Sequence, residues 1–404
     1  MKNGEASSYD NGTHVHRYLN YAIAILNGYN GAEPFHLYLK KYFSANKKHG
    51  SKDRKQITSL CYDHFRVGFG VSSKLSIQKK ILLATFLVEK KPSALLEKLK
   101  PLWNEKIDLD TSSKIAMVND VFSLEKIFPF VDELSEQINI RDFCLSFLIQ
   151  PKLFMRIRPG FNQAVFDKLK SAQIPFGKIN EYCLAFSNNE KVNDVINIDK
   201  EAVIQDYNSQ QTLNLTSYIK PHASEISVWD CCAASGGKSI LAFDLLKNIR
   251  LTVSDTRKNI LENLKKRFTK AGIKNYHSFV SDLSISLPQQ GISEKQDLII
   301  ADVPCSGSGT WARTPEQLYF FTKKKIDDYA VLQQKIVSNA IKILNENGYL
   351  LYITCSVFKK ENEDNIDFIQ RNLNLQLIKS EYLAGYQMHA DTLFAALFQK
   401  SVGE

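Results

Sequence analysis

The feature that most constrains this fold is a short apolar run that leads into a turn of small residues and then into a helical pattern. Residues 227–230 form the run, residues 231–238 form the turn Cys-Cys-Ala-Ala-Ser-Gly-Gly-Lys, and residues 239–247 have helical spacing. Gly236 and Gly237 let a ligand approach the main chain because they lack side chains, and the start of a helix offers unpaired N–H groups. The pattern predicts a strand, a turn and a helix. The turn either cradles a nucleotide or cofactor or serves only to reverse the chain.

The ending Gly237-Lys238-Ser239 is shared with the phosphate-binding P-loop of nucleotide hydrolases. That loop requires another glycine five positions before Gly237, and Cys232 stands there. The sequence therefore does not favour a nucleotide hydrolase. A turn of this form, which also lacks the Gly-x-Gly-x-x-Gly spacing of dinucleotide folds, fits S-adenosylmethionine at least as well as NAD.

Strand and helix patterns alternate regularly beyond residue 226. The strand candidates are residues 227–230, 251–255, 277–282, 297–303 and 349–354, with helical patterns at 239–247, 258–271 and 323–344. Two further strand candidates, 375–380 and 392–400, follow. Such alternation is typical of an α/β protein with a doubly wound, Rossmann-like sheet.

Acidic residues lie at the ends of four of these strand candidates: Asp230, Asp255, Asp282 and Asp302. Ligands of open α/β sheets bind outside the carboxyl ends of the strands, so the four carboxylates are expected around one crevice. Asp255 stands where an acid that accepts hydrogen bonds from both ribose hydroxyls would stand. The alternative is that each acid only caps the next helix.

The first part of the chain, residues 1–142, has apolar residues three and four positions apart and predicts an all-helical domain. A basic run between residues 40 and 55 includes Lys47, Lys48 and Lys52; it is either a solvated face or a surface for a polyanion. Residues 53–66 resemble a helix of NusB-like domains, which are helical modules that bind RNA or protein partners.

Residues 143–218 predict a small α+β module. Residues 153–160 alternate like a strand and stop at Pro-Gly, and shorter strand candidates follow near Tyr182 and Ala202. Arg156 and Arg158 fall on one face of the first strand, where they either contact phosphates or keep the surface soluble. Both interpretations remain open.

Length and composition narrow the class of protein. A chain of 404 residues is long enough for two or three domains, and its net charge of +9 favours polyanionic partners such as RNA. No apolar run approaches the roughly 18 residues of a membrane span, and the start shows no secretion signal. We expect a cytoplasmic, monomeric protein without a metal site, whose seven cysteines are reduced thiols.

Two cysteines each follow a strand candidate. Cys305 lies in the stretch 302–316, which begins Asp-Val-Pro-Cys-Ser-Gly-Ser-Gly, and Cys355 lies in the stretch 354–363, which begins Thr-Cys-Ser. A cysteine in such a place is often only a small core residue. Two of them on neighbouring strands predict a shared edge of one pocket.

With these stretches the sequence closely resembles the RNA cytosine-C5 methyltransferase family, which includes bacterial small-subunit rRNA enzymes and eukaryotic nucleolar and tRNA enzymes. The resemblance extends from residues 204–210 to residues 392–398. It implies a class I methyltransferase domain in which Cys355 is the nucleophile and Cys305 assists its release. The cofactor-binding residues that it implies are Cys232, Ala233, Ala234, Ser235, Gly236, Gly237, Lys238, Asp255, Asp282 and Asp302. The sequence departs from the family at Ser235, where proline is usual, and at Ala312, where the first arginine of a pair is common, which leaves Arg313.

The chemistry of cytosine supports these roles. C5 is a poor nucleophile until a thiolate, here Cys355, adds to C6 and makes C5 reactive toward an electrophilic methyl group. Asp302 is the nearest candidate for a proton donor or hydrogen bond at the N3 edge, and Cys305 is a candidate base for the C5 proton. DNA cytosine-C5 enzymes carry their nucleophile in a Pro-Cys motif, so the Thr-Cys-Ser of Cys355 favours an RNA enzyme.

We therefore expect an S-adenosylmethionine-dependent methyltransferase that forms 5-methylcytidine in rRNA or tRNA. The expected domains are residues 1–142, 143–218 and 219–404. One alternative is an RNA-binding or ribosome-assembly factor that keeps the fold without turnover, although both cysteines and the downstream acids argue against it. Another is a small-molecule methyltransferase, which would not need a basic helical domain.

Overall fold

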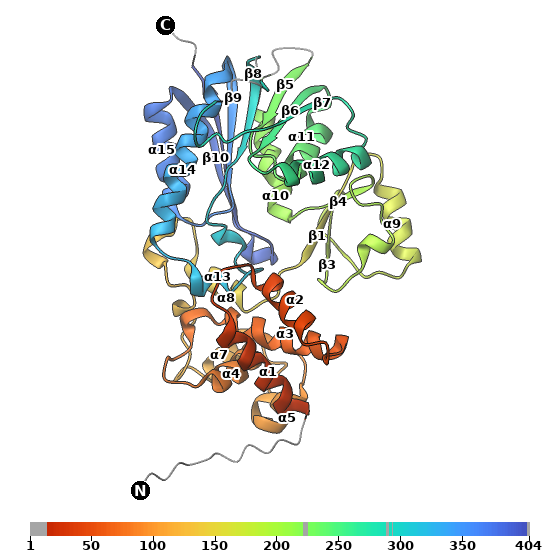
Figure 1. Cartoon of the computed structure of the whole chain (residues 1–404), viewed down its shortest axis with the longest axis vertical. Coiled ribbons are helices and arrows are strands. Elements are labelled where there is room, and N and C mark those ends of the chain that lie inside the picture. The colour runs from red at the N-terminus through yellow and green to blue at the C-terminus, as the bar shows by residue number, and fades with distance from the viewer. Residues whose placement is uncertain (1–13, 221–224, 288–290, 293, 402–404) are drawn as a thin grey trace. The chain divides into compact units, whose positions relative to one another are not determined.

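The computed structural model describes residues 14–220, 225–287, 291–292 and 294–401 and divides the chain into two compact units (Figure 1). The first, helical unit contains the described residues up to Val131 together with Ile140–Gln150 and Trp311–Phe321. The second unit contains Asp132–Asn139, Pro151–Thr310 and the described residues from Thr322 onward. The division into three domains at residues 142 and 218 stays a prediction.

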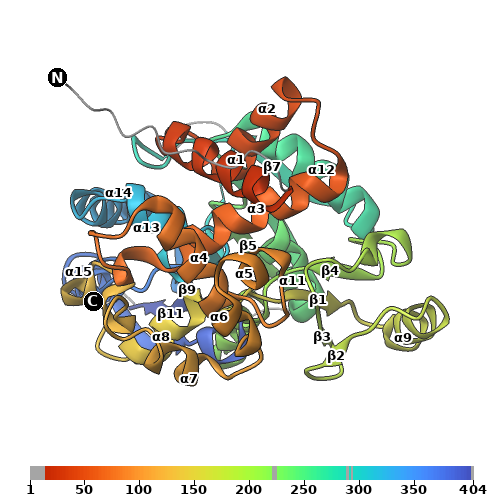
Figure 2. The same cartoon turned by 90° about the horizontal axis from the view of Figure 1, so that it is seen from below.

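Short and medium helices make up the helical unit, as the sequence predicted for this part of the chain. They are α1 (His14–Gly28), α2 (Phe35–Ala45), α3 (Ser51–Arg66), α4 (Ile77–Val88), α5 (Ala94–Leu99), α6 (Pro101–Glu105), α7 (Thr111–Ala116), α8 (Ile140–Phe147) and α13 (Gln317–Phe320). Helices α1, α3 and α4 pack side by side (Figure 2). Among the described residues, no helix combines the length and apolar character needed to cross a membrane.

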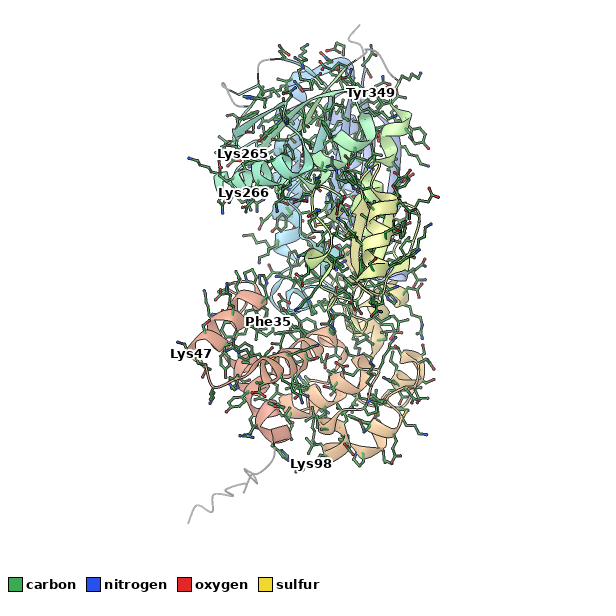
Figure 3. All side chains as sticks on the ribbon, turned by 90° about the vertical axis from the view of Figure 1, so that its right-hand side faces the viewer. Phe35, Lys47, Lys98, Lys265, Lys266 and Tyr349 are labelled. Atoms are coloured by element: carbon green, nitrogen blue, oxygen red, sulfur yellow. The ribbon has the colours of Figure 1, made fainter. Side chains whose placement is uncertain are left out.

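The basic run of the helical unit lies on the last part of α2, the following turn and the start of α3. Lys47, Lys48 and Lys52 are exposed, and Figure 3 shows Lys47 at the margin of the unit. Lys48 Nζ also lies 4.7 Å from the centroid of the Tyr21 ring. The run is therefore available to solvent and to an anionic partner.

A buried arginine explains why a segment distant in sequence belongs to the helical unit. Arg66, at the end of α3, is only 2% exposed, and its Nη1 donates to the carbonyl oxygens of Phe147, at 3.1 Å, and Ala312, at 2.9 Å. Trp311, beside that second acceptor, is 1% exposed and lies 4.8 Å from Phe321 between ring centroids. Ala312 thus contributes its backbone carbonyl to the packing of this unit.

The second unit begins with a small antiparallel sheet of order β2-β3-β1-β4. Its elements are β1 (Leu153–Ile157), α9 (Asn162–Ser171), β2 (Gly177–Lys178), β3 (Cys183–Phe186), β4 (Ala202–Ile204) and the short helix α10 (Tyr207–Gln211). Side chains of β1, such as Met155 and Ile157, pack against Val165 and Leu169 of α9. The predicted α+β texture of this region is confirmed.

Both interpretations of Arg156 and Arg158 were wrong, because these side chains are buried and form an ion pair. Arg156 Nη1 donates to Asp244 Oδ2 at 2.6 Å, and Arg158 Nη2 donates to Asp244 Oδ1 at 2.8 Å. All three side chains are less than 10% exposed. Asp244 lies on a helix, Gly237–Leu246, that packs against the large sheet described below. This carboxylate therefore joins the small sheet to the large one.

The large sheet has the order β10-β11-β9-β8-β5-β6-β7. Its strands are β5 (Ile226–Asp230), β6 (Ile249–Asp255), β7 (Tyr276–Val280), β8 (Gln296–Asp302), β9 (Leu344–Thr354), β10 (Leu375–Leu383) and β11 (Leu393–Lys400). Strands β5 to β9 pair in parallel, whereas β11 pairs antiparallel with both β9 and β10. Strand order reverses beside β5, which places its carboxyl end at a crevice where ligands bind in such sheets.

Helices cover both faces of this sheet (Figure 1). On one face α11 (Gly237–Leu246) and α12 (Lys258–Ala271) pack against alternate strand residues such as Val228 and Ile300. On the other face α14 (Lys324–Ala340) and α15 (Glu363–Asn372) pack against the intervening residues, such as Ile299. The predicted doubly wound α/β class is confirmed.

The ion pair of Asp244 gives a prediction about stability. Asp244→Ala should lower the free energy of unfolding by about 3–5 kcal/mol, because it leaves two buried guanidinium groups without their carboxylate. Urea unfolding followed by circular dichroism measures the change. As a control, Glu294→Ala removes the partner of Arg250 in a pair whose side chains are 64% and 53% exposed, and it should change stability by less than about 1 kcal/mol. Equal effects of the two substitutions would contradict the structural role of Asp244.

Candidate functional site

A cavity of about 620 Å³ lies at the carboxyl ends of β5, β6, β8 and β9. Its lining includes Cys232, Ala234, Asp255, Asp282, Asp302, Cys305 and Cys355. A larger hollow of about 1170 Å³ lies by the first residues of β6 and β7, Ile249 and Tyr276, and neither cysteine lines it. The smaller cavity is the candidate site because the predicted reactive groups meet there.

The turn after β5 has a backbone that favours glycine. Gly236 has φ +82°, and a Cβ placed there would lie 2.8 Å from Phe268 Cε1. Ala234, two residues earlier, also has a positive φ of 45°. The N–H of Ala233 donates to Ser254 O at 2.9 Å, and the N–H of Gly236 donates to Ala233 O at 2.8 Å. These constraints direct the turn toward the cavity and set the start of α11.

Asp230, the last residue of β5, has a structural role beside this turn. Ser239 Oγ of α11 donates to Asp230 Oδ2 at 2.6 Å, and the side chain is 1% exposed. Burial raises the pKa of Asp230 to about 7. Asp230 is not among the residues that line the cavity, so it holds α11 against the end of β5.

Asp255 presents a carboxylate to the cavity from the end of β6. Its Oδ2 accepts from the N–H of Ala234 at 3.0 Å, and its Oδ1 accepts from the N–H of Arg257 at 3.0 Å. Arg257 Nε also donates to Oδ1 at 3.0 Å from a side chain that is 58% exposed. Burial opposes the charge of Asp255, but the hydrogen bonds from Arg257 outweigh it and lower the pKa of this carboxyl.

Asp282 and Asp302 contribute two further carboxylates to the lining. Asp282 is exposed, and its Oδ1 accepts from the N–H of Ser284 at 2.9 Å. Asp302, at the end of β8, accepts from Lys238 Nζ at 2.7 Å. Burial disfavours the ammonium of Lys238, but the Asp302 carboxylate more than compensates and raises the pKa of Lys238. The site therefore holds a partly buried ammonium–carboxylate pair beside two further acids.

The two predicted cysteines meet at one end of the cavity. Cys305 Sγ lies 3.1 Å from Cys355 Sγ, and the N–H of Cys355 donates to Cys305 Sγ at 3.4 Å. The hydrogen bond with Cys355 and, next, burial raise the pKa of the Cys305 thiol far above its ordinary value. Cys305 therefore keeps its proton while Cys355 lies beside it.

The predicted cofactor residues divide into two groups. Cys232, Ala234, Asp255, Asp282 and Asp302 line the cavity. Ala233, Ser235, Gly236, Gly237 and Lys238 are not among the lining residues, and act on the site through the turn, through α11 or through the contact with Asp302. At Ser235, where proline is usual, the hydroxyl and carbonyl oxygens accept from Arg267 Nη1 at 3.0 and 2.9 Å.

Sequence reasoning missed the wall that α14 contributes. Tyr329, Leu332 and Ile336 line the cavity opposite the strand ends. Their spacing of three and four residues is that of one helix face, which was the available signal. Nothing in that spacing separates a cavity-lining face from a core face, so the sequence alone did not identify these residues.

This arrangement places two thiols and an ion pair around a cavity that is within the usual size range for small-molecule sites. A thiol at this position can attack a polarised double bond, and the second thiol lies close to the same point. The acids suit a cofactor that carries hydroxyl groups and positive charge. The site can therefore carry out covalent catalysis beside a bound cofactor.

Comparison with known proteins shows similarity to RNA methyltransferases. A family model described as "16S rRNA methyltransferase RsmB/F" matches residues 216–396. Ribosomal RNA small subunit methyltransferase B of Shewanella oneidensis is 32% identical over 181 residues, which are 45% of this chain and 41% of that protein. The tRNA (cytosine(72)-C(5))-methyltransferase of Pyrococcus horikoshii is 32% identical over 154 residues, which are 38% of each chain. The matched segment thus spans less than half of these relatives.

One solved structure resembles nearly the whole chain. The crystal structure of PH0851 has a TM-score of 0.69 at 18% identity and covers 96% of this chain and 99% of that one. At this identity the likeness concerns the fold, and it includes the helical part as well as the large sheet.

The Gly236 turn gives a prediction with a matched control. Gly236→Ala should destabilise the protein by about 1–2 kcal/mol for its left-handed backbone and by a further 1–3 kcal/mol, roughly, for the contact with Phe268. Gly272, at the end of α12, has φ +76°, and a Cβ placed there would meet open space, so Gly272→Ala should show the backbone cost alone. Urea unfolding of both variants checks the difference, and equal losses would contradict the close packing at Gly236.

Proposed function

We propose that this chain, whose residues 216–396 match a family model described as "16S rRNA methyltransferase RsmB/F", is an S-adenosylmethionine-dependent RNA methyltransferase that forms 5-methylcytidine. The observation that carries the proposal is the contact of Cys305 and Cys355, whose sulfurs lie 3.1 Å apart at the edge of an acid-lined cavity. The relatives named above act on small-subunit rRNA and on cytosine in tRNA, so rRNA or tRNA is the proposed substrate.

The residues of the cavity fit S-adenosylmethionine. The carboxylate of Asp255 would accept from the two ribose hydroxyls, the backbone of Cys232 and Ala234 would border the nucleoside, and Asp282 would contact the base. Asp302 and Lys238 would lie near the reacting end, because Asp302 lines the cavity together with Cys305 and Cys355. The bound cofactor would supply an electrophilic methyl group on a sulfonium centre.

Cys355 is the proposed nucleophile. Its thiolate adds to C6 of cytosine, and the electron pair of the C5–C6 double bond moves to C5, which then takes the methyl group. The ion pair of Lys238 and Asp302 would hold the N3 edge and supply the proton that balances the charge there. The addition is favoured because the pair is fixed in place before the substrate binds.

Cys305 is the proposed base of the second half of the cycle. It removes the C5 proton, the C5–C6 double bond reforms, and Cys355 leaves as a thiolate. Once Cys355 is bonded to carbon it no longer contributes the interaction that raises the pKa of Cys305 most. The thiol of Cys305 therefore gives its own proton to water more readily at that step, and the resulting thiolate takes the proton of C5.

The exposed basic run is the proposed RNA-binding surface of the helical unit. Lys47, Lys48 and Lys52 are exposed and would neutralise phosphates without reading sequence. A protein that only assists ribosome assembly would not require two sulfurs in contact beside a cofactor-sized cavity. The geometry therefore supports the enzyme over the non-catalytic RNA-binding factor.

The place of Asp255 predicts cofactor affinity. Asp255→Ala should weaken S-adenosylmethionine binding by roughly 1.5–3 kcal/mol, the range for hydrogen bonds to a charged group, and calorimetry measures it. The matched control is Arg257→Met, because the exposed Arg257 side chain occupies the same carboxylate. It should bind the cofactor at least as tightly as the unmodified protein. Unchanged affinity in a folded Asp255→Ala protein would remove Asp255 from the site.

The separate roles of the cysteines predict different failures in a methyl-transfer assay with small-subunit rRNA or tRNA transcripts. Cys355→Ala should be inactive and form no adduct, because C5 never becomes nucleophilic. Cys305→Ala should methylate at most once and stay attached to the RNA as a denaturant-resistant band, and the double variant should show no band. Bisulfite sequencing of the product locates the modified cytosine. A Cys355→Ala protein that still makes 5-methylcytidine would contradict this mechanism.

A further inference from the structure

A buried acid outside the cavity lining has contacts that the proposed chemistry does not yet use. Glu361 is 0% exposed and lies in a short turn of helix, Lys359–Glu361, that follows the loop of Cys355. Its sequence neighbours Lys359 and Lys360 are at the surface, so the turn directs this one acid inward. An acid buried so completely requires several hydrogen-bond donors to compensate for lost hydration.

The donors to Glu361 come from the loops of both cysteines. The N–H of Ser306, the residue after Cys305, donates to Glu361 Oε2 at 2.9 Å. Ser356 Oγ, on the residue after Cys355, donates to Glu361 Oε1 at 2.6 Å. One carboxylate thus spans the two loops, with one oxygen on each.

The same cluster also holds the other sides of the two loops. Gln333 of α14 donates to Glu361 Oε2 at 2.8 Å and to the carbonyl oxygen of Pro304, the residue before Cys305, at 3.0 Å. Asn362 accepts from Thr354 Oγ1, on the residue before Cys355, at 2.6 Å and donates to Ser356 O at 2.9 Å. Each cysteine is therefore held through both of its chain neighbours.

Further buried side chains hold Glu361 and Gln333 in place. The hydroxyl of Tyr352 donates to the carbonyl oxygen of Glu361 at 2.6 Å, and Asn365 donates to Gln333 Oε1 at 2.7 Å. Tyr352, Gln333, Asn362 and Asn365 are all at most 1% exposed. A polar network whose members satisfy one another in this way is rigid, and changes at one member are transmitted to its neighbours.

We propose that Glu361 is a positioning residue that sets the separation of Cys305 and Cys355 by the reach of its side chain between Ser306 and Ser356. The inference rests on the proposed function, because it assigns the bridge to one step of that cycle. Cys355 alone is sufficient to add to C6, whereas release requires Cys305 at the correct distance from C5. Loss of the bridge should therefore impair release more than attack.

Two substitutions separate reach from charge. Glu361→Asp keeps the charge but is one methylene shorter, so one carboxylate no longer reaches both loops. Glu361→Gln keeps the reach and an oxygen for the N–H of Ser306, but loses the charge. We expect turnover of Glu361→Asp to fall on the order of 100-fold, the scale for a misplacement of about 1 Å, and its RNA adduct to accumulate. Glu361→Gln should turn over within roughly threefold of the unmodified protein and accumulate no adduct, a small change of the size that follows from about 0.6 kcal/mol.

The matched control is Glu363→Asp, the same change at the next acid in the chain. Glu363 accepts from Ser135 Oγ at 2.7 Å rather than from Ser306 or Ser356, so turnover should be unchanged. Ser356→Ala removes the bridge from the side of Cys355 and tests the same idea if Glu361→Asp does not fold; it too should accumulate adduct. Calorimetry should give the same S-adenosylmethionine affinity for all of these variants.

The measurement is the fraction of labelled RNA in a denaturant-resistant band, together with the rate of methyl transfer, on an RNA that the unmodified protein methylates. A folded Glu361→Asp protein that turns over normally without a band would overturn the proposal, and so would equal failure of Glu361→Asp and Glu361→Gln, since charge and not reach would then matter. Failure of the proposed function looks different. In that case the unmodified protein methylates neither the small-subunit rRNA transcripts nor the tRNA transcripts, and Cys305→Ala gives no band.

Discussion

The parallel pairing of β8 with β9 brings to one edge of the sheet the two cysteines on which the proposed chemistry depends. Asp302 lies opposite Ile353 in this pairing, and the N–H of Val303 continues it by donating to Ile353 O at 3.1 Å. Cys305 and Cys355 therefore leave the sheet from neighbouring points on one edge. A shift of one residue would turn every side chain of a strand to the opposite face, so the hydrophobic layers on both faces also protect the geometry of the site.

Most of the large sheet could be predicted from the sequence because the signals are local. The apolar run before the Gly236 turn, the acid at the end of β6 and the helix Lys258–Ala271 each depend on residues that are close together in the chain. The parallel order of the strands then brings Asp255, Asp302 and Cys355 to one cavity without further information. Local pattern and known sheet topology together were sufficient for this part of the site.

The features that the sequence did not reveal depend on distant partners. Arg156 and Arg158 belong to the small sheet, and nothing near them in the chain shows that they meet Asp244 of α11 inside the protein. Glu361 stands among charged residues that are typical of a surface, and the donors that compensate for its burial come from the loops of β8 and β9 and from Gln333 of α14. In each case at least one partner that compensates the buried charge is distant from it in the sequence.

The segment Trp311–Phe321 belongs to the helical unit, although the chain before it and after it belongs to the other unit. The polypeptide thus leaves the unit of the large sheet after the loop of Cys305 and returns to it at the start of α14. This path has an evolutionary consequence, because a gene fusion or loss that exchanges one end of a protein moves only a continuous stretch of DNA. Replacement of the N-terminal helices alone would leave Trp311 and Phe321 without the packing that buries them. An exchange of the N-terminal helices would therefore preserve this packing only where the new helices fit the segment Trp311–Phe321.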